Sequence, residues 1–191
     1  MLKLAEEYLD IAVEATGGGG HDLAEALDRL PVAIYLTDTA GTITHFNRAC
    51  ITLAGRTPTV RHDKWCVTWK LYTLDGARLP HDECPMAVAI RERRKVRGAE
   101  AVAERPDGTR VRFVPYPTPL FEADGTFVGA VNLLVDVTQI RHSEYLRDRQ
   151  RIAAGSPLRS TTHAPSPRSK GWRRNMRDRP GSRGTQTRRR T

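Results

Sequence analysis

The sequence predicts an α+β fold whose elements follow in the order strand, strand, helices, strand, strand, strand. Five stretches are rich in β-branched and aromatic residues, and turn sequences with Asp and Gly separate several of them. Helical spacing of apolar residues appears between the second and third stretches. The chain has 191 residues, of which 39% are apolar, enough for one domain with flanking segments but not for two full domains.

Two helices are predicted before the first strand. Apolar residues recur among acids from residue 2 to residue 14, and the glycine run 17–20 ends this helix. Residues 1–16 are therefore predicted to form an N-terminal helix. Asp22 is a suitable N-cap for a second helix, which Pro31 stops.

A β-hairpin and a capped helix come next. Residues 32–37 and 42–46 read as strands, and the sequence Asp-Thr-Ala-Gly between them reads as a turn. Asn47 is expected to cap the following helix and Gly55 to end it. Residues 58–80 show no clean period, and we expect short helical turns and loop around an aromatic cluster there.

The segment PHDECPM predicts a helix start. Pro85 suits the first position of a helix, where its missing N–H costs little, and Cys84 then falls at the cap. The helix is expected over residues 86–94, with Met86 and Ile90 on one face.

Three further strands are predicted at residues 96–104, 110–121 and 126–137. Apolar residues occupy both parities of the last strand, so both of its faces should be covered. One face takes the helices of the domain, and the other needs a further helix or a second subunit. We expect this outer face, together with Leu4, Leu9 and Val13 of the first helix, to be a dimer or helix-docking surface.

The basic character of the chain lies in its C-terminal part. The formal net charge is +9, and residues 155–191 contribute ten Arg and one Lys against one Asp, which leaves about −1 for the rest. Residues 155–191 are rich in Arg, Ser, Pro and Gly and are predicted to be disordered. Nucleic-acid binding through this tail is one interpretation, and out-of-frame translation of a GC-rich gene is another.

The cysteines and the hydropathy indicate a reducing compartment and no membrane span. Three cysteines are an odd number, no signal peptide is evident, and no disulfide is expected. The longest apolar stretch, residues 127–135, is far shorter than the roughly 20 residues that cross a bilayer. We therefore expect a cytoplasmic protein without membrane contact.

Five segments occur in a characteristic order: LPVAIYLTD, the hairpin turn TAGTITHFN, DGARLPHDECPMAVAIRE, the hairpin RPDGTRV and PLFEADGTFVGAVNLLVDVT with its closing Asp136-Val137-Thr138. This ordered set resembles a PAS domain, the small sensory module of bacterial signalling proteins, over about residues 22–138. The resemblance implies a five-stranded antiparallel sheet with helices over one face and a small pocket between sheet and helices.

The resemblance also implies that the closing Asp136 and Thr138 relay a signal to a linker helix, here residues 139–154, and that the output is often a histidine kinase. In this sequence Val137, Ile140 and Leu146 form a thin apolar stripe that suits a two-helix seam. Neither a phosphoacceptor helix nor a glycine-rich nucleotide loop is evident after residue 154. No enzyme is therefore predicted in this chain.

A ligand pocket is predicted on the inward side of the last strand, at positions that share the parity of Asp136 in PAS-like domains. An amide such as that of Asn132 among apolar side chains can orient a small ligand. The alternative is that Asn132 bonds within the protein and side chains fill the space. The candidate pocket residues are Val128, Ala130, Asn132, Leu134, Met86, Ile90, Trp65 and Trp69.

Four residues are candidate metal ligands, enough for tetrahedral zinc: His62, Cys66, His81 and Cys84. The alternative is buried cysteines and surface histidines. Haem bound by Cys84 or by a histidine is a second cofactor candidate, although no cofactor is required. Cys50 does not reproduce the Asn-Cys-Arg motif of the light-sensing subfamily, which argues against a flavin adduct.

The predicted function is that of a sensory and dimerisation module in signal transduction, which binds a small molecule or a signalling-protein partner and relays through the linker helix. A homodimer is expected. Three alternatives stay open: an N-terminal fragment of a sensor histidine kinase of a two-component system, a regulator of transcription or nucleic-acid adaptor that uses residues 155–191, and a metal-binding domain.

Overall fold

The computed structural model describes residues 2–16 and 20–153. The strands are β1 Ala33–Thr37, β2 Ile43–Phe46, β3 Lys70–Tyr72, β4 Arg78–Leu79, β5 Ala101–Glu104, β6 Arg110–Pro115, β7 Thr118–Phe121 and β8 Phe127–Asp136. The helices are α1 Leu2–Ala15, α2 Gly20–Asp28, α3 Arg48–Ala54, α4 Pro85–Glu92 and α5 Thr138–Ala153, with a 3₁₀ turn η1 at His81–Glu83. The predicted disordered tail, residues 155–191, lies outside the described residues.

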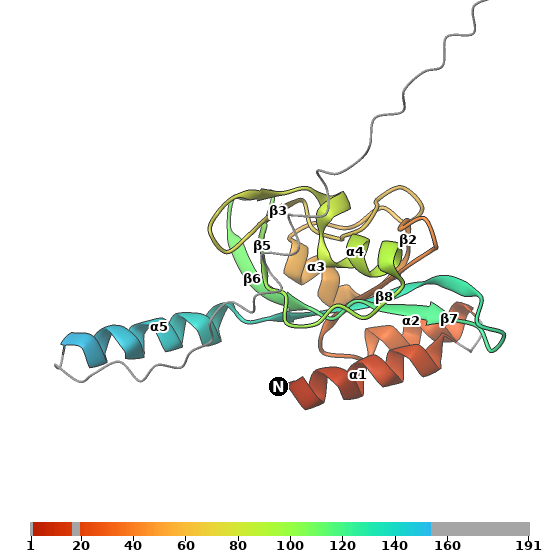
Figure 1. Ribbon diagram of the computed structural model, residues 1–191, viewed down its shortest axis with the longest axis horizontal. Coiled ribbons are helices and arrows are strands. Elements are labelled where there is room, and N and C mark those ends of the chain that lie inside the picture. The colour runs from red at the N-terminus through yellow and green to blue at the C-terminus, as the bar shows by residue number, and fades with distance from the viewer. Residues whose placement is uncertain (1, 17–19, 154–191) are drawn as a thin grey trace, which may run out of the picture. The chain divides into compact units, whose positions relative to one another are not determined.

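The predicted fold class is confirmed, because one antiparallel sheet is combined with helices (Figure 1). The strand order is β2-β1-β8-β6-β5-β3-β4, and β7 also pairs with β8. The sheet thus has eight strands where five were expected. Two of the additional strands, β3 and β4, extend one edge, and the third, β7, is the second half of a predicted long strand that breaks after Pro115.

The prediction of helical turns in residues 58–80 was wrong for its second half, which forms the hairpin β3–β4. Leu71 pairs with Leu79 across this hairpin. The turn closes with a hydrogen bond of 3.0 Å from the N–H of Gly76 to the carbonyl of Thr73, and Gly76 has a φ of 84°. A glycine at this left-handed position lets the chain reverse within a few residues.

Both predicted helix starts in the middle of the chain and the predicted end of α3 are confirmed, whereas α4 ends at Glu92 and not at Arg94. The side chain of Asn47 accepts the N–H of Cys50 at 3.3 Å and caps α3, and Gly55 ends that helix with a φ of 65°. Cys84 is the N-cap of α4, and Pro85 is its first residue. These caps fix where α3 and α4 begin over the sheet.

Helices cover both faces of the sheet. Helix α3 packs on β1 and α4 on β8, whereas α1 packs on the opposite face of β8 together with α2 (Figure 1). The cluster on the α1 side joins Leu9, Leu27, Ile34, Val131 and Leu133, all fully or almost fully buried. The outer face of the last strand, which was expected to take a helix or a second subunit, is therefore occupied by the chain's own first helix.

Arg97 ties α1 to the sheet. Its guanidinium donates to both carboxylate oxygens of Glu6 in α1, at 2.7 and 3.3 Å, and also to the carbonyl of Pro117 and the hydroxyl of Thr118, each at 3.0 Å. Leu4, one of the three α1 residues expected at the docking surface, is 49% exposed. Among the described residues, no helix combines the length and the apolar character that crossing a bilayer requires.

Candidate functional site

Asn132 lies in the interior, and both halves of its amide are bonded within the protein. Its Oδ1 accepts the backbone N–H of Tyr116 at 3.0 Å, at the break between β6 and β7, and its Nδ2 donates to Tyr35 Oη at 2.9 Å. The Tyr35 hydroxyl in turn donates to the carbonyl of Trp65 at 2.8 Å. Burial raises the pKa of Tyr35 well above its ordinary value, so this hydroxyl stays a donor.

The predicted pocket residues come together only in part. Ala130, Leu134, Met86 and Ile90 are buried with Asn132 where α4 packs on β8. Val128 lies apart and is 40% exposed, because the pairing of β7 with β8 shifts by one residue at this position. The strict alternation assumed for the whole strand therefore fails at its start.

The two tryptophans lie outside this interior group. The ring of Trp65 packs directly on Gly41, where an added Cβ would approach the ring to 2.2 Å. Trp69 is 42% exposed, and the ammonium of Lys70 lies 3.9 Å from its ring centroid. Binding of a small ligand beside Asn132 stays a prediction.

The four candidate metal ligands do not converge. The side chain of His62 is 83% exposed, because its backbone belongs to a surface turn in which its N–H bonds to Thr59. Cys66 and Cys84 are buried, and His81 contacts a threonine hydroxyl instead of a sulfur. Within residues 2–16 and 20–153, no group of three or more His, Cys, Asp or Glu side chains is arranged to hold a metal ion.

All three cysteines are buried and free. Burial raises the pKa of each of the three thiols, Cys50, Cys66 and Cys84. A thiol needs to ionise before it binds a metal or attacks an electrophile, so these environments favour packing over reactivity. Ligation of haem or zinc by these residues stays a prediction.

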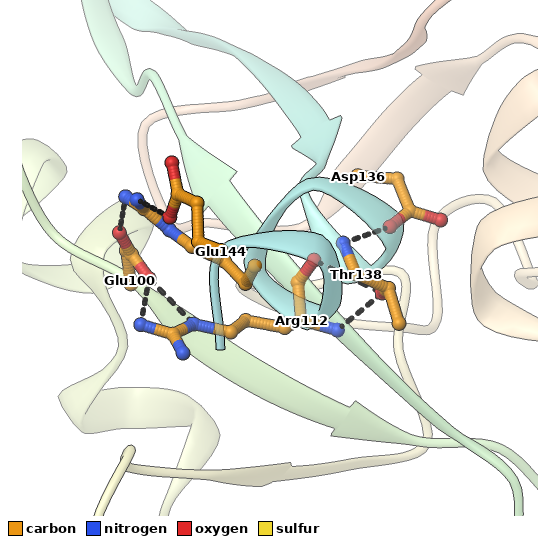
Figure 2. A network of polar contacts seen from close by, with 6 residues as sticks. Glu100, Arg112, Asp136, Thr138 and Glu144 are labelled. Carbon is orange, nitrogen blue, oxygen red and sulfur yellow. Dashed lines mark hydrogen bonds and ion pairs between the residues drawn. The ribbon is translucent and has the colours of Figure 1, made fainter. Parts of the chain in front are cut away.

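The predicted relay residues form a bonded junction between β8 and α5 (Figure 2). Asp136 ends β8 two residues before α5, and its Oδ1 accepts the N–H of Thr138, the first residue of that helix, at 2.8 Å. The Thr138 hydroxyl accepts the backbone N–H of Arg112 in β6 at 2.9 Å and lies 3.4 Å from the carbonyl of the same residue. The N–H of Val137 donates to that carbonyl at 2.8 Å. The first residue of α5 is thereby attached to β6 as well as to β8.

Glu100 adds a second attachment between the sheet and α5. One carboxylate oxygen accepts from Nε of Arg112 at 2.6 Å, and the other accepts from Arg141 in α5, also at 2.6 Å (Figure 2). Arg141 then donates to Glu144 at 2.7 Å. Burial acts to raise the pKa of Glu100, but Arg141 and Arg112 outweigh it and hold that pKa below its usual value.

The sequence pointed to Asp136 and Thr138 as candidate relay residues and gave no signal for Glu100, Arg112 and Arg141, which the fold brings beside them. The three charged residues come from separate segments, so no local spacing links them. Beyond the first turn of α5, the side chains of residues 142–151 are exposed. The junction can therefore hold the start of α5 in one orientation while the rest of the helix stays available to another molecule.

Comparison with known proteins agrees with this architecture. The family model described as PAS domain matches residues 31–139. The search of curated proteins gives no match.

Among solved structures, the chain is similar to the PAS domain of a Colwellia psychrerythraea protein, with 22% identity, 61% of this chain and 94% of that chain covered and a TM-score of 0.41. It is also similar to the PAS domain of the fruit-fly ELK potassium channel, with 16% identity, 63% and 99% covered and a TM-score of 0.49. A third similarity is to the PAS domain of Bordetella pertussis BvgS, with 16% identity, 70% and 96% covered and a TM-score of 0.42.

The assignment rests on the family model, which covers more than half of the chain. The chain belongs to the PAS domain family.

Proposed function

We propose that residues 22–138 act as a sensory domain that relays a change in the sheet to the linker helix α5, without catalysis by this chain. The observation that carries the proposal is the double contact of Glu100 with Arg112 in β6 and Arg141 in α5. Through this contact and the Thr138 hydroxyl, the position of α5 depends on the position of β6 relative to β8.

The path from the interior to α5 is short. Asn132 and Asp136 are four residues apart on β8, so a displacement of the strand at the buried amide also moves Asp136, which accepts the N–H of Thr138. Val137, directly before the helix, is 3% exposed and belongs to the core. It therefore does not take part in the helix seam for which it was predicted.

The bonds of the junction between the sheet and α5 are weak enough for a signal of ordinary size to break or form them. Ion pairs between partly exposed side chains contribute about 0.2–1 kcal/mol each, and neutral hydrogen bonds about 0.5–1.5 kcal/mol. A signal shifts such a junction only through a difference in affinity between its two arrangements. An input worth about 1–3 kcal/mol is enough to release or fix the start of α5.

The output partner in this proposal is a second copy of α5 or a signalling protein that binds it. Ile140, Tyr145 and Leu146 expose apolar surface on this helix, between 39% and 57% of each side chain. In this proposal the homodimer forms through Ile140 and Leu146, the two residues of the predicted stripe that lie in α5. Replacement of Leu146 by Glu is expected to shift sedimentation toward the monomer.

The relay is tested by amide hydrogen exchange of the full chain. Tyr35→Phe perturbs the interior, and we expect faster exchange in the first two turns of α5. When Thr138→Val is already present, Tyr35→Phe should not speed exchange in these turns any further. The coupling free energy between the two substitutions should then be about 0.5 kcal/mol or more. Thr126→Val, at an exposed turn before β8, is the matched control. Simple additivity of the Tyr35 and Thr138 effects would refute the relay.

Each of the other predictions about function has a separate test. As a fragment of a two-component sensor kinase, this chain alone should not phosphorylate itself from ATP. As a regulator of transcription or nucleic-acid adaptor, the chain should show salt-dependent binding to nucleic acid that is lost when residues 155–191 are deleted.

A ligand beside Asn132 should produce a thermal shift that the Asn132→Leu variant lacks. The free cysteines are consistent with the proposed cytoplasmic location.

A further inference from the structure

A depression of about 160 Å³ opens to solvent between η1 and the loop that follows α3. It lies apart from the α5 junction and from the buried amide of Asn132. Its lining includes one carboxylate, Asp63, beside the basic side chains of Arg56 and Lys64, and the complete set is Arg56, Asp63, Lys64, Cys66, Thr68, Trp69 and His81. Neither the family assignment nor the relay gives this group a role.

The lining has an excess of positive charge. Arg56 pairs with Asp63, and its Nε donates to the carbonyl of Val67 at 3.0 Å. Its second amino group, Nη1, has no protein partner among the described residues. Lys64 is exposed and forms no ion pair within the described part of the chain. Two sets of charged N–H donors are thus free at the opening.

Two polar groups lie deeper in the depression. Thr68 is 2% exposed, and its hydroxyl donates to Cys66 Sγ at 3.2 Å and lies 3.4 Å from His81 Nε2. Burial, and then the charges of Arg78 and Arg56, hold the pKa of His81 below its ordinary value. The imidazole is therefore uncharged at neutral pH, and an anion placed beside it would favour its protonated form.

The opening is connected to the interior by a strained turn. Trp65 has a φ of 69°, and the N–H of Cys66 donates to the carbonyl of Lys64 at 2.8 Å, so one tight turn spans these three residues. The carbonyl of Trp65 accepts from Tyr35 Oη at 2.8 Å, and Tyr35 Oη accepts from Asn132. Lys64 at the opening and Asn132 in β8 are thus linked by one turn, one partly buried hydrogen bond and one buried hydrogen bond.

We propose that this depression binds a small anion, a carboxylate or a phosphate, through Lys64 and Arg56 with Thr68 and His81 at its base. The bound anion draws Lys64 toward the opening, and the turn carries that displacement to the Trp65 carbonyl and to Tyr35. The inference rests on the relay function proposed above and names its input. Charge-assisted hydrogen bonds of this kind are stronger than neutral ones, and the small volume restricts the anion to a compact group.

The test follows the imidazole resonances of His81 in the full chain by NMR. Sodium acetate and inorganic phosphate are titrated separately, which distinguishes the two anion classes, and sodium chloride at equal ionic strength is the control. We expect a saturable shift with at least one of the two anions and a rise in the pKa of His81 at saturation. Lys64→Gln should weaken binding about tenfold, which corresponds to about 1.4 kcal/mol. Lys3→Gln, an exposed lysine in α1, is the matched control and should not change it.

A shift that chloride reproduces, or equal affinity in the Lys64→Gln and Lys3→Gln variants, would overturn the anion site. The side-chain amide resonance of Asn132 and the backbone resonances of α5 are followed in the same titration. If both sets of resonances shift together with those of His81, the result supports transmission from the anion site through Tyr35 and Asn132 to α5. Saturable binding that leaves α5 unchanged would establish the site and count against the relay function, so the two ideas fail separately.

Discussion

The Thr138 hydroxyl accepts the backbone N–H of Arg112 at 2.9 Å, and this bond attaches the first residue of α5 to the strand next to the one from which the helix emerges. A helix that simply continued from β8 would be held only by its own chain. The additional bond makes the orientation of the helix start depend on two strands. Any displacement between β6 and β8 therefore acts directly on α5.

Thr138→Val removes the hydroxyl and keeps the shape of the side chain. Loss of a partly buried hydrogen bond costs about 0.5–1.5 kcal/mol, and here the Arg112 N–H is left without its partner. We expect amides in the first turns of α5 to exchange about two- to tenfold faster, while the amides of β1 and β8 change little. Thr138→Ser keeps the hydroxyl and should restore most of the protection. Equal exchange in the valine and wild-type chains would contradict this role.

Glu100 gives the junction a pH dependence. Its pKa is lower in the folded chain than the ordinary 4.5, so the ionised form stabilises the fold above about that pH, and the contribution is lost as the pH falls through the folded value. Glu100→Gln should therefore be less stable than wild type at pH 7, by about 1 kcal/mol. The difference should shrink as the pH falls below 4.5 and vanish below the folded pKa of Glu100. A difference that persists unchanged at acidic pH would show that the carboxylate charge is not the cause.

The order of the elements was predictable because each depends on local signals. Asn47 and Gly55 mark both ends of α3, and Pro85 marks the start of α4, through backbone requirements that few other residues meet. The hairpin β3–β4 escaped prediction because its strands are only three and two residues long, too short for a periodic pattern. Its stability comes from pairing with β5, which is a contact distant in sequence.

The candidate site was predictable only where it lies on one segment. Asp136 and Thr138 stand together at the end of β8, and a familiar closing pattern marked them. Glu100 and Arg141 are brought together by the fold alone, over a separation of 41 residues. The bulge that exposes Val128 depends on the register between β7 and β8, which alternation within one strand does not reveal.

Tyr35→Phe isolates the buried hydrogen bonds beside the predicted pocket. The change removes the acceptor of the Asn132 Nδ2 and the nearer of two donors to the Trp65 carbonyl, the other being Cys84 Sγ at 3.8 Å, without leaving a large cavity. Buried polar groups that lose their partners cost about 1–3 kcal/mol each, so we expect the free energy of unfolding to fall by about 1–3 kcal/mol. Tyr145→Phe, on the exposed face of α5, is the control and should stay within about 0.5 kcal/mol of wild type. Equal effects of the two changes in urea denaturation would refute the assignment.

Leu9 and Leu4 lie on the same helix, α1, but differ in burial. Leu9 is 1% exposed against the outer face of β8, whereas Leu4 is 49% exposed. Removal of a buried leucine side chain costs about 2–5 kcal/mol, because transfer energy is lost and a cavity remains. Leu9→Ala should therefore destabilise the chain by about that amount in urea denaturation, and Leu4→Ala by less than about 0.5 kcal/mol.

The same pair of variants distinguishes two uses of the sheet face beneath α1. If α1 covers this face permanently, Leu9→Ala lowers stability and the sedimentation behaviour stays that of wild type. If the face also binds a second copy, loosening α1 frees Ile34, Val131 and Leu133, and Leu9→Ala should increase self-association with protein concentration. The Arg97–Glu6 contact favours permanent cover, because it holds α1 at a second point outside the apolar cluster. We therefore expect unchanged sedimentation for Leu9→Ala, and increased association would show that the first helix is displaceable.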